Sequence, residues 1–211
     1  MTVNDASLGE SGSKLSKVAA TSLLMGVTRA SSEAYALFMI MAMISACHDF
    51  TLSWKVRIFK NTKICFPAEL LIVNKGIISS TKGDMSGKET LIINYDESEC
   101  SACVINHLAE SVNKYKTISK SNGCNVVILF SPLPENAQEV LINLIDAHLN
   151  FPIYIDQYGE FRSLNPRIPD DKRFHSFLLN KNGYPIYVGN PLNSQKLFDI
   201  FIKTLETYST E

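Results

Sequence analysis

The sequence lacks an excess of charge of either sign. Its 211 residues include 20 lysines and arginines against 21 aspartates and glutamates, which leaves a formal net charge of −1. It has no basic stripe of the kind that binds nucleic acid, and no block of like charge that would form an interaction tail. Internal repeats and low-complexity tracts are absent too, and we expect one domain plus an accessory segment.

A hydrophobic run long enough to cross a membrane as a helix is also missing. The apolar segment at residues 34–47 has a core of about 13 residues, too short to span a bilayer but right for a signal peptide. It ends in "ISAC", which resembles the lipobox of bacterial lipoproteins, where the cysteine is acylated and the peptide bond before it is cut. The resemblance implies a signal region over residues 1–46, with Met25 as a possible true start, and a lipid on Cys47.

A lipid on Cys47 would make the mature protein a membrane lipoprotein of the bacterial cell envelope, facing the periplasm or the cell exterior. The alternative is an uncleaved hydrophobic helix with an incidental cysteine.

Residues 47–83 are predicted to form a short β appendage at the amino terminus. Apolar residues alternate strictly at four positions, Leu52, Trp54, Val56 and Ile58. Such alternation is typical of a half-buried strand. The apolar stretch that follows contains Pro67, a residue confined to strand edges and bends.

Residues 84–211 alternate between strand and helix patterns. Short apolar runs have the length of buried parallel strands at residues 90–95, 125–131 and 151–156. Helices are expected at residues 100–119 and 135–149.

The chain then turns back on itself before it ends in a helix. A hairpin is predicted at residues 174–189, because Asn182-Gly183 between apolar runs is a strong turn signal. The last helix is expected to bury one face, formed by Leu197, Ile200, Phe201 and Leu205. Together these elements predict an α/β fold with a mixed sheet covered by helices on both faces.

The stretch "SGKETLIINYDESECSAC" combines an apolar strand with a Cys-x-x-Cys pair, Cys100 and Cys103. With "FPIYIDQYGEF" and "FLLNKNG" further along, it resembles the thioredoxin-like proteins of the TlpA-like group of envelope thiol–disulfide oxidoreductases. The similarity extends over residues 87–206. It implies a thioredoxin-like sheet and a redox-active cysteine pair that acts on disulfides or thiols of envelope proteins.

Two positions depart from the pattern of that group. Phe174 stands where the group has a cis-proline, and Glu99 stands where it has a tryptophan. A cis bond before phenylalanine would cost about 2.5–4 kcal/mol, and a trans bond is therefore predicted. These changes bear on redox efficiency and substrate docking rather than on the fold.

The predicted catalytic residues are Cys100 and Cys103. Cys100 would be the exposed nucleophile at a helix amino terminus, and Cys103, one turn further in, would be the resolving thiol. Asp96, Glu97 and Glu99 disfavour a thiolate here, so we expect a reductant-like pair. The exchange needs no cofactor, and we expect a monomer. The alternative is a binding module with a structural disulfide.

A metal site is the remaining possibility. Cys100, Cys103 and His175 would suit Cu(I) or Zn, and this set resembles the Sco-type copper proteins, although those use a Cys-x3-Cys spacing. His107 is a second candidate ligand. A c-type haem is excluded, because Val104 rather than histidine follows Cys103.

The other two downstream cysteines, Cys65 and Cys124, are expected to be buried, inert thiols beside strands, or less readily a disulfide. Asp170 and Asp171 have the pattern of an exposed loop and not of a catalytic pair.

Overall fold

The computed structural model describes residues 34, 37, 39, 51–85, 87–96 and 101–209, without the side chains of 101–103 and 209. The chain forms two compact units, Met1–Ser53 and Trp54–Glu211. Three residues of the predicted signal region, Ala34, Leu37 and Met39, are described, and all three are helical. The rest of that region, Cys47 included, lies outside the described residues. In the described part of the chain, no helix is both long and apolar enough to cross a bilayer.

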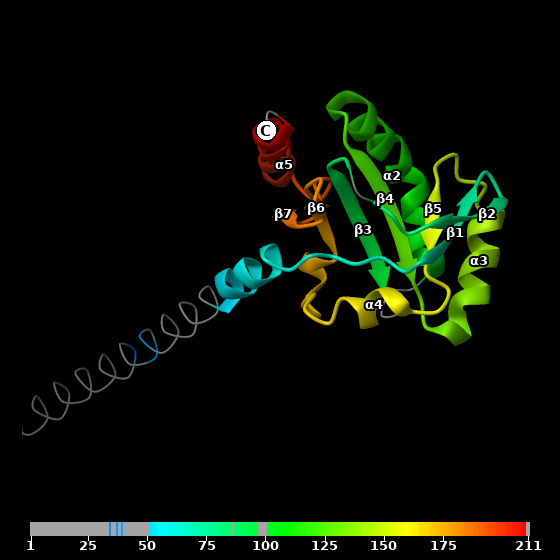
Figure 1. Cartoon of the computed structure of the whole chain (residues 1–211), viewed down its shortest axis with the longest axis horizontal. Helices are drawn as coiled ribbons and strands as arrows, with labels where there is room; N and C mark the ends of the chain where they lie inside the picture. The colour runs from blue at the N-terminus through cyan, green and yellow to red at the C-terminus, as the bar shows by residue number, and fades with distance from the viewer. Residues whose placement is uncertain are drawn as a thin grey trace, which may run out of the picture. The chain divides into compact units, whose positions relative to one another are not determined.

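A seven-stranded mixed sheet forms the centre of the second unit, with the strand order β2-β1-β5-β4-β3-β6-β7 (Figure 1). The strands are β1 (Glu69–Asn74), β2 (Ile77–Lys82), β3 (Thr90–Asp96), β4 (Asn125–Ser131), β5 (Ile153–Ile155), β6 (Ser176–Leu179) and β7 (Pro185–Val188). Strands β3, β4 and β5 are parallel, while β1, β2, β6 and β7 pair with their neighbours in antiparallel fashion.

Helices cover both faces of this sheet. On one face lie α2 (Ser101–Asn122), α3 (Ala137–Asp146) and α5 (Gln195–Ser209), whose buried side chains share one core with alternate residues of the strands. The short helices α4 (Glu160–Leu164) and η2 (Lys172–Phe174) supply Phe161 and Phe174, which are buried outside that core. The short helix η1 (Pro134–Asn136) leads into α3.

The topology confirms the α/β, thioredoxin-like fold. A parallel pair, β3 and β4, is joined through α2, and a later antiparallel hairpin, β6 and β7, is followed by α5. The hairpin turn lies at the predicted Asn182-Gly183: Gly183 has φ +85°, and the side-chain oxygen of Asn180 accepts hydrogen bonds from the backbone of Asn182 and Tyr184. Within the appendage predicted at residues 47–83, the β1–β2 hairpin forms the carboxyl-terminal part, and it extends the central sheet by pairing β1 with β5.

The strand predicted around Trp54 is wrong, because residues 51–60 are helical. Val56 and Phe59 lie three residues apart, a spacing that brings side chains to one face of a helix, and Phe59 is completely buried. Trp54 is exposed. A segment this short fits both periods, and packing of Phe59 against the sheet decides between them.

The helix predicted at the end of the chain is confirmed as α5, with one residue misplaced. Phe201 and Leu205 are buried and Leu197 is half-buried, but Ile200 is 45% exposed. Ile200 directly precedes Phe201, and adjacent helix residues point about 100° apart, so Ile200 turns away from the sheet.

Candidate functional site at the carboxyl ends of the parallel strands

The carboxyl ends of the parallel strands meet at one edge of the sheet. Asp96, the last residue of β3, pairs in register with Ser131, the last residue of β4. The antiparallel strand β6 begins at this same edge, where Asn94 donates its backbone N–H to the carbonyl of His175 at 2.8 Å. The edge therefore brings together residues from three distant parts of the sequence.

The predicted cysteine pair follows β3 in the chain. Strand β3 ends at Asp96 and α2 begins at Ser101, so Cys100 directly precedes the first residue of a 22-residue helix. The side chains of Cys100 and Cys103 lie outside the described residues. The first turn of α2 contains no acidic residue. The amino end of a helix favours negative charge, and the acidic residues that oppose a thiolate precede the helix in the sequence.

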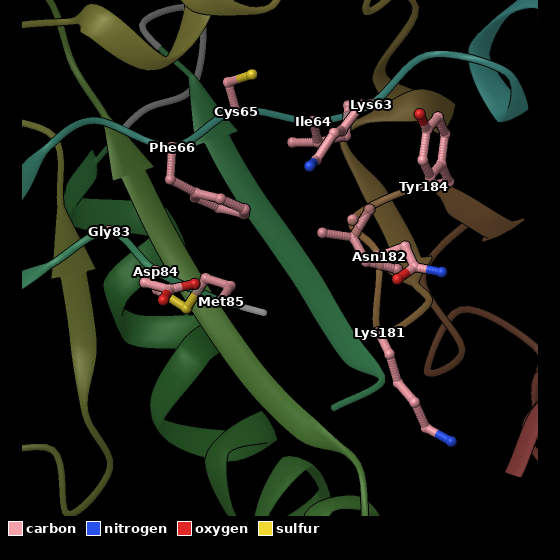
Figure 2. Close-up of a pocket in the computed structure, with 12 residues that line it drawn as sticks. Lys63, Ile64, Cys65, Phe66, Gly83, Asp84, Met85, Lys181, Asn182 and Tyr184 are labelled. Atoms are coloured by element: carbon pink, nitrogen blue, oxygen red, sulfur yellow. The ribbon is translucent and has the colours of Figure 1, made fainter. Parts of the chain in front are cut away.

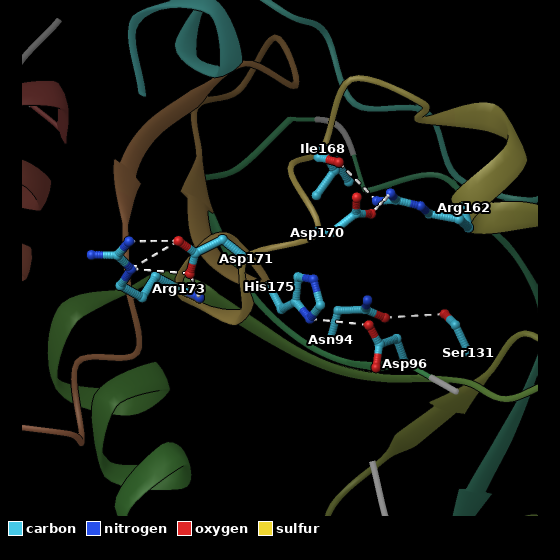
Figure 3. A network of polar contacts seen from close by, with 9 residues as sticks. All are labelled: Asn94, Asp96, Ser131, Arg162, Ile168, Asp170, Asp171, Arg173 and His175. Atoms are coloured by element: carbon cyan, nitrogen blue, oxygen red, sulfur yellow. Dashed lines mark hydrogen bonds and ion pairs between the residues drawn. The ribbon is translucent and has the colours of Figure 1, made fainter. Parts of the chain in front are cut away.

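His175 is the predicted ligand that the structure describes best. It is 6% exposed, and its Nδ1 lies 3.4 Å from Oδ2 of Asp96 (Figure 3). This contact lacks hydrogen-bond geometry, and Nδ1 is a buried polar atom that finds no hydrogen-bond partner among the described residues. Beside the pair, the Ser131 hydroxyl donates to Oδ1 of Asn94 at 3.0 Å. Sequence analysis treated Asp96 only as a nearby charge and did not pair it with His175.

Ion pairs that are partly exposed to solvent hold the loop that leads to His175. Asp171 caps η2 by accepting the backbone N–H of Arg173 at 3.0 Å, and its carboxylate also contacts the Arg173 guanidinium at 2.5 Å. This hydrogen bonding lowers the pKa of Asp171 to about 2. Asp170 contacts Arg162, whose guanidinium also donates to the carbonyl of Ile168 (Figure 3). Both aspartates thus lie in a loop, as predicted, and their ion pairs with arginines hold that loop.

Phe174, which stands where the TlpA-like group has a cis-proline, belongs to an aromatic cluster with Phe59 and Phe177. Phe59 meets the other two rings edge to face, at centroid distances of 5.7 and 5.2 Å. The three rings are almost fully buried, and the backbone N–H of Phe174 donates to the carbonyl of Asp171 at 2.8 Å. No peptide bond in the described ranges is cis, as predicted for Phe174. The Phe174 side chain is thus part of a buried aromatic cluster.

The other predicted metal ligand is not brought to His175. His107 is exposed on α2. Within the ranges that the structure describes, no group of three or more histidine, cysteine, aspartate or glutamate side chains could hold a metal ion. Any metal site that used His175 would need at least one ligand from outside the described side chains, such as Cys100 or Cys103.

Cys65 is exposed, and the prediction of a buried thiol is wrong at this position. It lines a cavity of about 520 Å³ with Lys63, Asp84, Lys181 and Tyr184 (Figure 2). The buried side chain of Asn165 fixes the Cys65 backbone: Oδ1 accepts the Cys65 N–H at 2.8 Å, and Nδ2 donates to the Cys65 carbonyl at 2.6 Å. One hundred residues separate the two partners, and no local pattern signals this contact.

Cys124 is buried as predicted, and neither it nor Cys65 forms a disulfide. Burial raises the pKa of the Cys124 thiol to about 11, with a smaller contribution from the negative charge of Glu89. A thiol that stays protonated at neutral pH is a poor nucleophile. Cys124 is therefore a core residue.

Comparisons with known proteins give matches in structure alone. No protein-family model and no curated protein sequence matches the chain. A thioredoxin-like protein from Porphyromonas gingivalis shares 16% identity over 70% of this chain and 94% of its own, with a TM-score of 0.43. The thioredoxin domain of a thiol-disulfide oxidoreductase from Bacteroides vulgatus shares 14% identity over 68% of this chain and 98% of its own, with a TM-score of 0.45. Yeast Sco1 with copper bound shares 14% identity over 68% of this chain and 96% of its own, with a TM-score of 0.44.

These scores are all below 0.5, and the thioredoxin-like assignment therefore depends on the strand order and connections described above.

Proposed function

We propose that the chain is a thiol–disulfide oxidoreductase of the bacterial cell envelope that reduces disulfides of partner proteins through Cys100 and Cys103. The observation that carries this proposal is the position of the Cys-x-x-Cys sequence between the end of β3 at Asp96 and the first turn of α2. The partial positive charge at the start of a long helix favours a thiolate, the form of cysteine that attacks disulfides.

The proposed reaction exchanges one disulfide for another. The Cys100 thiolate attacks a sulfur of the partner's disulfide, which forms a mixed disulfide and releases one partner thiolate. The Cys103 thiolate then attacks Cys100, forms the Cys100–Cys103 disulfide and releases the second partner thiolate. Two electrons pass to the partner, and its two thiolates take up the protons that the protein's thiols lost. A thiol reductant of the envelope would return the pair to the dithiol form.

The acidic residues around the pair favour the reducing direction. Asp96, Glu97 and Glu99 precede the nucleophile, and negative charge destabilises a second negative charge on the thiolate. A less stable thiolate makes the dithiol form a stronger reductant. We therefore expect a reduction potential closer to that of thioredoxin, about −270 mV, than to that of DsbA, about −120 mV.

The proposed location follows from the "ISAC" sequence. We infer cleavage before Cys47 and lipid attachment there, which would anchor the mature chain to a membrane of the cell envelope as a monomer. Mass spectrometry of the membrane-extracted protein tests this. An unmodified Cys47, or retained residues before it, would contradict it.

Cysteine variants of the full chain test the redox proposal. Cys103→Ser should trap a mixed disulfide with a partner through Cys100, whereas Cys100→Ser should trap none. In the wild-type dithiol form, Cys100 should be alkylated faster than Cys103. Equal alkylation rates and identical behaviour of the two variants would instead indicate a structural disulfide on a binding module.

A second candidate function is the binding of Cu(I) or Zn by Cys100, Cys103 and His175. The buried Nδ1 of His175, which has no hydrogen-bond partner among the described residues, favours it, because a metal would supply that partner. Two thiolates and an imidazole are donors that suit both ions. Titration of the reduced full chain with Cu(I) or Zn should then give one bound ion, with weaker binding in His175→Ala and none lost in the exposed control His148→Ala. Failure to bind either ion would exclude this candidate.

A further inference from the structure

Two long stretches of the sequence beside the carboxyl-terminal edge of the sheet contain no lysine or arginine. No lysine or arginine occurs between Lys88 and Lys114, or between Lys120 and Arg162. These two stretches contain β3, β4, α3, β5 and the loops that follow the strands. Four cations follow before His175, namely Arg162, Arg167, Lys172 and Arg173, and two of them, Arg162 and Arg173, are each paired with an aspartate. The charged residues of the segments after β4 and β5, residues 132–136 and 156–160, are therefore all acidic, and two of them, Glu135 and Glu160, are exposed.

Two large apolar side chains stand out from these loops. Leu133, after β4, is 42% exposed, and Tyr158, after β5, is 67% exposed. The loops lie side by side, since a Cβ placed on Gly159 would be 3.7 Å from the carbonyl oxygen of Pro132 and 4.0 Å from Cδ of Pro134. The two apolar residues thus belong to one surface.

Both side chains are presented by rigid backbone. Leu133 lies between two prolines in an extended conformation, φ −61° and ψ 145°, and its carbonyl accepts the N–H of Asn136 at 2.9 Å. Beside Tyr158, the buried carboxylate of Asp156 accepts the N–H groups of Glu160 at 3.1 Å and Phe161 at 2.7 Å. A surface that is ordered before binding loses little conformational entropy when a partner docks.

Each apolar residue is followed two positions later by an exposed glutamate, Glu135 and Glu160. Neither glutamate makes an ion pair with any residue that the structure describes. An exposed leucine or tyrosine alone needs no explanation. Two of them on adjoining rigid loops, each beside a glutamate that has no counter-ion, define a surface that is apolar at its centre and negative at its rim.

We propose that Leu133, Glu135, Tyr158 and Glu160, the β4–β5 patch, dock a partner-protein segment that carries apolar and basic side chains beside its disulfide. This inference depends on the proposed redox function, for which it specifies the substrate class. Nucleic acid and anionic lipid would be repelled by the same charges.

The cysteine pair follows, in the sequence, the strand that lies next to the patch. Strand β4 carries the first loop and pairs with β3 as far as Asp96 and Ser131. Cys100 follows Asp96 by four residues, a length of chain that spans at most about 14 Å. A segment docked on the β4–β5 patch can thus place its disulfide within reach of Cys100.

Peptide binding to the full chain in detergent tests the docking surface. Two fluorescent peptides without cysteine share the same leucine and phenylalanine residues, and differ in having lysines in one and glutamates in the other. The basic peptide should bind about tenfold more tightly at low salt, and high salt should remove most of the difference. Glu135→Lys combined with Glu160→Lys should reverse the preference, and Leu133→Ser combined with Tyr158→Ser should weaken both peptides.

A matched control carries the same types of substitution on exposed residues of α5 and α2, Ile200→Ser with Glu110→Lys, and should bind like the wild type. Equal affinity for the two peptides, or patch variants that behave like the control, would overturn the docking surface. Reduction of hydroxyethyl disulfide, which is too small to need docking, reports the cysteine chemistry separately. All patch variants should still reduce hydroxyethyl disulfide. If the wild type does not reduce it, the redox function is refuted, and the peptide measurements still test the docking surface.

Discussion

The amide of Asn165 ties the segment around Cys65 to the rest of the protein, and its removal should have a large, measurable cost. Asn165 is 2% exposed and makes three side-chain hydrogen bonds: two with the Cys65 backbone and one, at 2.8 Å, to the carbonyl of Phe161. Asn165→Ala leaves one N–H and two carbonyl groups without these partners. A buried polar group without a partner costs about 1–3 kcal/mol.

The expected loss is smaller than the sum of three such terms. The two hydrogen bonds to the Cys65 backbone are only partly buried, so water can replace them in part, whereas the hydrogen bond to the Phe161 carbonyl is buried. We therefore expect Asn165→Ala to lower the free energy of unfolding by about 2–4 kcal/mol. Asn165→Asp keeps the shape but turns the donor toward both carbonyls into an acceptor with a charge. At neutral pH, Asn165→Asp should lower the free energy of unfolding more than Asn165→Ala does. This difference should shrink as pH falls, because protonation of the aspartate removes its charge and restores one hydrogen-bond donor.

Urea unfolding of the wild type and variants, followed by circular dichroism, measures these differences. The m values should agree, so that a change in midpoint reports stability. Asn136→Ala is the matched control, because Asn136 is exposed and its side chain caps no backbone group of α3. The control should change stability by less than about 0.5 kcal/mol. An Asn165→Ala variant as stable as the control would refute the reasoning.

Three further predictions follow from the contacts and pKa shifts. A variant with Cys47, Cys100 and Cys103 all replaced by serine isolates the other two thiols. At pH 8, iodoacetamide should modify Cys65 and leave Cys124 unmodified until the protein unfolds. Mass spectrometry that finds both cysteines labelled in the folded state would contradict the burial of Cys124. Phe174→Pro should destabilise the protein by about 3–5 kcal/mol, because it removes a buried ring from the aromatic cluster. Restoring the proline that the TlpA-like group has at this position should therefore not raise the rate of disulfide reduction. A variant that is as stable as the wild type and reduces disulfides faster would contradict this prediction. Hydrogen bonding to Arg173 lowers the pKa of Asp171 to about 2, so the contribution of Asp171 to stability should be present at neutral pH and be lost as pH falls from about 4 toward 2. In acid titrations that follow unfolding, the stability of Asp171→Asn should change less over that range.

Local sequence patterns determined most of the sheet and the place of the cysteine pair. The apolar runs of β3 and β4, and the Asn182-Gly183 turn of the last hairpin, act through side-chain period and backbone preference within a few residues. The position of Cys-x-x-Cys between a strand and a helix follows from the same local signals.

Contacts between distant residues decided the rest. Residues 51–60 alternate like a strand yet form a helix, because Phe59 packs into the aromatic cluster with Phe174 and Phe177. Asn165 reaches Cys65 across one hundred residues. The pairing of His175 with Asp96 required the antiparallel strand β6 to begin beside the end of β3. The joining of the loops that carry Leu133 and Tyr158 required the parallel strands β4 and β5 to end at one edge, and only the folded sheet brings those ends together.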